Sequence, residues 1–117
     1  MILLVEDEPI TRNAFADMLR REGHQVIQAA DGAQALSLLG KSHVDLVITD
    51  LAMPRLTGFD LIGQIRSVCP DIPILIISGH ISQDAERISD GNAEFMHKPV
   101  DPPDLIATVR RLLPTPR

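Results

Sequence analysis

The chain has 117 residues, of which 44% are hydrophobic and 23% are charged, and its net charge is −5. This length suits a single domain with a sizeable core, and the ordinary composition argues against a disordered chain or a membrane protein. The negative charge argues against nucleic-acid binding, which needs clustered Lys and Arg. Met1 leads into an apolar run without a basic leader and Cys69 is the single cysteine, so we expect a cytoplasmic protein.

Short apolar runs alternate with stretches of helical period about five times along the chain. This alternation is typical of a parallel sheet covered by helices on both faces, so we predict an α/β fold, a doubly wound (βα)5 three-layer sandwich. The polar second strand is expected at a sheet edge, and the third and fourth strands at its centre. The predicted strands cover residues 2–5, 24–29, 44–49, 72–77 and 94–96.

The first predicted helix begins at Pro9 and ends at Gly23, where glycine stops the periodic pattern. Its apolar stripe is expected to face the sheet and consists of Ile10, Ala14, Phe15, Met18 and Leu19.

Four further helices are predicted along the rest of the chain. Asp31 is expected to cap the second helix, and residues 59–65 carry the apolar stripe of the third. Residues 81–90 have few apolar anchors, which predicts a weakly packed helix and a candidate moving part. The last helix begins at Asp101, and residues 114–117 are expected to form a tail or the start of a linker.

Polar groups stand just past four of the predicted strands: Glu6 and Asp7, then Asp50, Ser78 and Lys98. The carboxyl ends of parallel strands share one edge of a sheet, so we expect these side chains to line one crevice. Acids held this close repel one another unless a cation lies among them. A hard cation with oxygen ligands fits this need, so we expect Mg²⁺, with Mn²⁺ as the alternative.

A carboxylate beside a metal, a lysine and a hydroxyl is suited to phosphoryl transfer, because the charge that develops lies on oxygens that cations and donors can hold. Asp50 is the acid on a central strand and could attack phosphorus to form an acyl phosphate. Lys98 would then hold a phosphoryl oxygen.

Four motifs resemble those of the receiver domain of bacterial two-component response regulators, a CheY-like family. The resemblance covers residues 1–113 and implies a five-stranded parallel sheet in the order 2-1-3-4-5. The motifs are Val5–Pro9, Asp50–Pro54 with Gly58, Ser78–Gly79 and Phe95–Pro99.

The resemblance implies a role for each matching position. Asp50 is the phosphoacceptor, which receives its phosphoryl group from the phosphohistidine of a sensor histidine kinase or from a phosphotransfer protein. Asp7 is a direct metal ligand, Glu6 acts on the metal through bound water, and Ala52 offers its backbone carbonyl. Lys98 contacts the phosphoryl group.

The resemblance also implies a conformational switch. Ser78 moves toward the phosphoryl group as the aromatic side chain of Phe95 turns inward, and the Lys98–Pro99 peptide is cis. The domain would catalyse its own phosphorylation and dephosphorylation without being an enzyme for a separate metabolite. We expect residues 82–113 to form the face on which an output domain, an output protein or a second copy docks, with no membrane or nucleic acid involved.

Three departures and several alternatives stay open. Glu6 replaces a frequent Asp, Phe95 lacks a tyrosine hydroxyl, and Ser78 is a common substitute for threonine. Ala52 and His80 flank the path of the attacking water. Residues 6–8 could be only an acidic N-cap, and Phe95 only a core residue. The functional alternatives are a pseudo-receiver that binds partners without phosphorylation, a Mg²⁺-dependent aspartyl phosphatase, which would carry a DxD motif, and a flavodoxin-like electron carrier.

Overall fold

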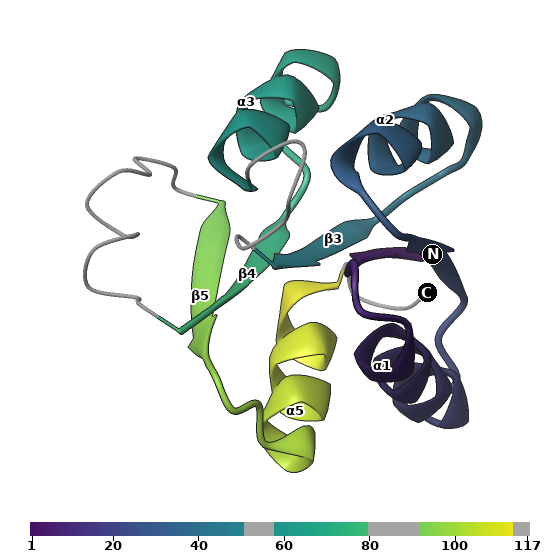
Figure 1. The fold of residues 1–117 in the computed structure, drawn as a ribbon, viewed down its shortest axis with the longest axis vertical. Helices are drawn as coiled ribbons and strands as arrows, with labels where there is room; N and C mark the ends of the chain where they lie inside the picture. The colour runs from purple at the N-terminus through teal and green to yellow at the C-terminus, as the bar shows by residue number, and fades with distance from the viewer. Residues whose placement is uncertain (51–57, 80–91, 114–117) are drawn as a thin grey trace.

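The computed structural model describes residues 1–50, 58–79 and 92–113. These residues form a three-layer sandwich in which α1 and α5 cover one face of a parallel sheet and α2 and α3 cover the other (Figure 1). The strand order is β2-β1-β3-β4-β5, so the predicted fold class and order are confirmed. The elements are β1 (Ile2–Val5), α1 (Pro9–Arg21), β2 (Val26–Ala29), α2 (Gly32–Lys41), β3 (Leu46–Asp50), α3 (Gly58–Val68), β4 (Ile74–Ser78), β5 (Ala93–His97) and α5 (Pro102–Leu112).

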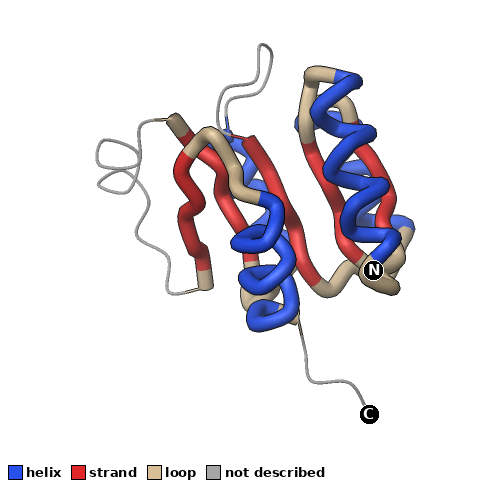
Figure 2. Tube along the Cα trace, turned by 90° about the horizontal axis from the view of Figure 1, so that it is seen from below, coloured by secondary structure: helices blue, strands red, loops and turns tan. Residues whose placement is uncertain are grey.

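Side chains on both faces of the central strands are buried, which explains their nearly unbroken apolar runs. In β1, Ile2 and Leu4 belong to the core cluster that α1 and α5 cover, whereas Leu3 and Val5 belong to the cluster under α2 and α3. Seen from the side of α1 and α5, these two helices run roughly along the direction of the strands that they cover (Figure 2). The two cores hold the strands so that their carboxyl ends form one edge.

The second strand is shorter than predicted because His24 takes part in the turn that ends α1. The Gly23 N–H donates to the carbonyl of Arg20 (3.0 Å), and the His24 N–H donates to the carbonyl of Leu19 (3.2 Å). This pair of bonds is the Schellman arrangement, and Gly23 adopts the positive φ of +92° that it requires. The prediction that His24 lies in the strand was therefore wrong, and β2 begins at Val26.

The third and fourth strands lie further along the chain than the apolar runs suggested. Asp50 pairs in register with Ile77, and Ser78 pairs with His97, so both polar residues are the last residues of their strands rather than the first residues beyond them. Ladder pairing continues past the last apolar side chain because it depends on the backbone. This register places Asp50 within the sheet edge itself.

The predicted stripe of the first helix was wrong at Ile10 and Ala14, both of which are exposed. Ile10 precedes the buried Leu19 by nine residues, about two and a half helical turns, so its side chain points away from the sheet. It is 79% exposed. Ala16, which the predicted stripe did not include, is buried against the sheet.

The helix starts follow their expected capping chemistry. The Asp31 side chain accepts a hydrogen bond from the Gln34 N–H (2.8 Å), and the Glu8 side chain accepts one from the Thr11 N–H (2.8 Å). Glu8 alone therefore caps α1. Glu6 and Asp7 are left available for another role.

The predicted helix over residues 81–90 and the tail of residues 114–117 lie outside the described residues, as does the loop of residues 51–57. Within the described ranges, no helix combines the length and the apolar character needed to cross a membrane.

Candidate functional site

The chain brings Asp50 and Lys98 together at the carboxyl edge of the sheet. Asp50 ends β3 and is only 6% exposed, while Lys98 follows directly after β5. The Nζ of Lys98 donates a hydrogen bond to Oδ2 of Asp50 and forms an ion pair with it. The ammonium group therefore lies where it can also hold an anion bound to Asp50.

Glu6 is a second buried acid at the same edge. It is 7% exposed, and within the described residues its Oε2 has no hydrogen-bond donor. Burial, followed by the neighbouring charge of Asp50, raises the pKa of Glu6 to about 7, although Lys98 opposes the rise. Burying a carboxylate oxygen without a hydrogen-bond donor destabilises the folded state, so a bound cation or a proton at this oxygen would be stabilising.

Asp7, the residue that follows Glu6, is exposed. Its negative charge contributes, less than burial and Asp50 do, to the raised pKa of Glu6. Within the described part of the chain, no three His, Cys, Asp or Glu side chains converge as a ready metal cluster. Ala52, the further ligand that the resemblance implied, lies outside the described residues.

These observations fit a hard divalent cation by their chemistry. The donors are carboxylate oxygens alone, which Mg²⁺ prefers, and one of them, Glu6 Oε2, is buried without a partner in the described structure. Soft ligands such as Cys69 lie elsewhere, at the end of α3.

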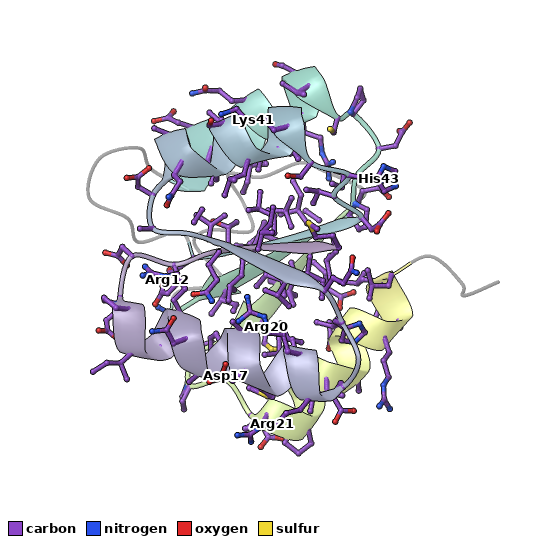
Figure 3. The ribbon with its side chains drawn as sticks, turned by 90° about the vertical axis from the view of Figure 1, so that its right-hand side faces the viewer. Arg12, Asp17, Arg20, Arg21, Lys41 and His43 are labelled. Carbon is purple, nitrogen blue, oxygen red and sulfur yellow. The ribbon has the colours of Figure 1, made fainter. Side chains whose placement is uncertain are left out.

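Arg12 also contacts the site, although no sequence motif pointed to it. Its Nη1 donates a hydrogen bond to the backbone carbonyl of Glu6 (2.9 Å), and Figure 3 shows Arg12 between α1 and the sheet. The guanidinium thereby holds the peptide unit that joins Glu6 to Asp7. A side chain that acts on a carbonyl six residues earlier leaves no recognisable motif.

The remaining predicted residues are placed as follows. Ser78 ends β4, but its side chain, like His80, lies outside the described part of the structure. Phe95 in β5 is partly buried and packs against the core cluster on the α2 and α3 side. The Lys98–Pro99 peptide is cis, as the resemblance implied.

Glu6, Asp50 and Lys98 also line one cavity of about 440 Å³, which opens between α1 and the segment that leads into α5. Residues far apart in sequence thus face a common space. An acid at the end of a central strand, an ammonium group on it and a second buried acid beside it form an arrangement suited to phosphoryl chemistry.

A sequence profile described as the response regulator receiver domain matches residues 2–110. The chain belongs to this family. The crystal structure of the receiver domain of NtrX from Brucella abortus is 32% identical, with a TM-score of 0.88 over 97% of this receiver domain and 98% of that one.

Two curated relatives are longer proteins. The receiver domain is 35% identical over 102 residues to the sensor histidine kinase RcsC from Escherichia coli strain K12, a match of 86% of this chain and 11% of RcsC. It is 33% identical over 114 residues to the response regulator MprA from Mycobacterium sp. strain KMS, which covers 96% of this chain and 50% of MprA. The receiver domain therefore spans half or less of these relatives.

Proposed function

We propose that this receiver domain accepts a phosphoryl group on Asp50 in a reaction that depends on Mg²⁺, and that the modification switches its conformation to control an output. The observation that carries the proposal is the ion pair between Lys98 Nζ and the buried carboxylate of Asp50 at the sheet edge.

Asp50 would act as the nucleophile. One carboxylate oxygen attacks phosphorus, a P–O bond to Asp50 forms, and the bond from phosphorus to the donor breaks. With a phosphohistidine of a sensor kinase or phosphotransfer protein as donor, the leaving group is the imidazole nitrogen, which takes up a proton. Attack of water on the same phosphorus would later release phosphate and restore the carboxylate.

Lys98 would move its hydrogen bond from the carboxylate to a phosphoryl oxygen. The ammonium group already lies on Asp50 Oδ2, so little rearrangement is needed to stabilise charge as it develops. The lysine thus supplies a preorganised cation at the reacting group.

Glu6 and Asp7 would hold the metal, together with Asp50 and the backbone carbonyl of Ala52. A bound Mg²⁺ neutralises phosphoryl oxygens and allows the acids to stay ionised. Mn²⁺ has the same preference for oxygen ligands and is the alternative ion. Arg12 keeps the Glu6 carbonyl in place while these side chains bind.

Phosphorylation would bias a two-state equilibrium of the domain. Ser78 ends β4, and Phe95 lies in β5, the edge strand that pairs with β4. New bonds to the phosphoryl group would shift this region, and differential binding of a few kcal/mol is sufficient for such a shift.

The output surface would lie on residues 82–113. In the described part of this face, Arg111 of α5 pairs with Glu94 of β5, and Arg110 pairs with Glu22 after α1. A partner, an output domain or a second copy that docks here would exchange these internal ion pairs for pairs across an interface.

The domain would work in the cytoplasm, which is consistent with its free Cys69, and would process only its own phosphoryl group rather than a separate metabolite. The alternative functions are weaker. A pseudo-receiver would not need the contact between Asp50 and Lys98, and no DxD motif follows the first strand as an aspartyl phosphatase would require.

The test is incubation of the purified domain with acetyl phosphate, with Mg²⁺ in one sample and EDTA in another, followed by intact mass measurement. We expect one added phosphoryl group only with Mg²⁺, and none in Asp50→Asn. The matched control is Asp45→Asn, an acid in the segment that leads into the same strand, which should be phosphorylated normally.

Full phosphorylation of Asp50→Asn would show that the nucleophile is another residue. No added mass in any sample, together with an unchanged spectrum on adding beryllofluoride, would favour the pseudo-receiver.

A further inference from the structure

The cavity beside Asp50 is much larger than a metal ion needs, and most of its wall is apolar. Its volume is about 440 Å³. Leu4, Ile48 and Ile77 line it from three neighbouring strands, while Phe15 lines it from α1 and Val100 from the segment before α5. Pockets of this size, lined by apolar side chains with a few polar groups, are typical of small-molecule sites.

Two acids and one basic side chain line the polar end of the cavity. Glu6 and Asp50 both line it, and Lys98 is the cation beside them. Lys98 donates to Asp50, whereas Glu6 Oε2, buried at this end, has no donor within the described residues. A ligand that supplies an N–H donor with positive charge would satisfy this oxygen.

We propose that this cavity binds a small organic cation, whose ammonium or amidinium head donates to Glu6 and whose aromatic or branched apolar body lies between α1 and Val100. A hydrated metal ion matches only the acidic end, because the apolar wall offers it no ligands. The organic cation matches both ends. This inference goes beyond the proposed phosphorylation and concerns a second kind of ligand.

The proposed site predicts that the organic cation and a divalent metal ion compete for binding. The cationic head and a divalent cation would both need the Glu6 carboxylate, so each should weaken the binding of the other. By the same argument, an occupied cavity should slow phosphorylation of Asp50, which lines it. The receiver would then respond to a small molecule as well as to a phosphodonor.

The test uses 2-phenylethylamine as the probe and 2-phenylethanol as its uncharged control, titrated into the domain in EDTA while methyl resonances are followed by NMR. We expect the amine to shift the methyl signals of Leu4, Ile77 and Val100 and to bind at least about tenfold more tightly than the alcohol, as a charge-assisted hydrogen bond predicts. Mg²⁺ should displace it.

Three variants separate the contribution of the apolar cavity from that of the Glu6 carboxylate. Val100→Phe should fill the apolar space and abolish binding of the amine, and Thr11→Leu, which fills the same cavity from α1, tests this point if Val100→Phe does not fold. Glu6→Gln should weaken the amine about tenfold and leave the alcohol unchanged. The matched control Glu94→Gln removes an acid that does not line the cavity and should bind normally.

Equal binding of amine and alcohol, undiminished binding in both filled variants, or binding that Mg²⁺ does not affect would each overturn the proposal. These measurements use no phosphodonor. A failure of Asp50 to accept phosphate would therefore not be mistaken for a failure of this site.

Discussion

Glu6 should make the metal-free domain less stable at neutral pH than under mildly acidic conditions. Burial and the charge of Asp50 raise the pKa of this acid from an ordinary 4.5 to about 7. Between those two values the unfolded chain has lost the Glu6 proton while the folded domain keeps it. Folding then takes up a proton, so the free energy of unfolding falls as the pH rises through this window.

The magnitude follows from the same two values. Each tenfold change in proton affinity corresponds to about 1.4 kcal/mol, so the rise in pKa predicts a loss of roughly 3 kcal/mol by pH 7. Glu6 lines an open cavity, so solvent screens part of this charge and the measured loss should be smaller than this value. The loss is a large share of the stability of a typical small domain.

Urea denaturation in EDTA at several pH values between about 5 and 8 measures this effect. Glu6→Gln stays neutral at every pH and should lack the decline, while Asp17→Asn, which removes an exposed acid of α1, should keep it. Burial and the charge of Arg110 lower the pKa of His24, which adds stability as the pH rises toward 6.5. The prediction therefore applies to the difference between wild type and Glu6→Gln.

The same denaturation experiment, repeated with Mg²⁺ in place of EDTA, gives a second test. The metal binds the ionised acid, so it should stabilise the wild type more at pH 8 than at pH 5, as expected for linked proton release. Parallel stability curves for wild type and Glu6→Gln across this range would refute the assignment of Glu6 as the buried, proton-binding acid.

Three further predictions concern other parts of the domain. Lys98→Ala should slow phosphorylation by acetyl phosphate at least about tenfold while the domain stays folded by circular dichroism; loss of the fold would instead make Lys98 a structural residue. Arg12→Ala should weaken Mg²⁺ binding in a calorimetric titration, with partial recovery in Arg12→Lys, because the Glu6 carbonyl loses its donor; unchanged affinity would separate Arg12 from the site. Gly23→Ala should lower the free energy of unfolding by about 1–2 kcal/mol, because φ is +92° there while an added Cβ would meet no atom within 4 Å; an unchanged denaturation midpoint would contradict this backbone origin.

The sequence predicts the fold because burial on both faces of a parallel sheet demands apolar runs, as in β1 and β3. Strand ends were less predictable. Asp50 and Ser78 stay in their strands because backbone pairing ignores the change to a polar side chain. His24 left its expected strand because the turn at Gly23 uses its N–H to close α1.

The site was predictable where its chemistry depends on residue type and only partly where it depends on packing. Asp50 and Lys98 carry the reacting groups at strand ends, so the topology alone brings them together. The lack of a donor for Glu6 Oε2 among the described residues and the hydrogen bond from Arg12 to the Glu6 carbonyl both depend on how α1 packs against the sheet. The cavity is the space left between packed side chains, and no sequence pattern records it.

The most direct test of the central claim is to locate the phosphoryl group. Borohydride reduces an aspartyl phosphate to homoserine, which mass spectrometry of peptides assigns to one position. After treatment with acetyl phosphate and Mg²⁺, homoserine is expected at Asp50 and at no other acid. Homoserine at Asp7 or Asp45 instead, with Asp50 unmodified, would contradict the account.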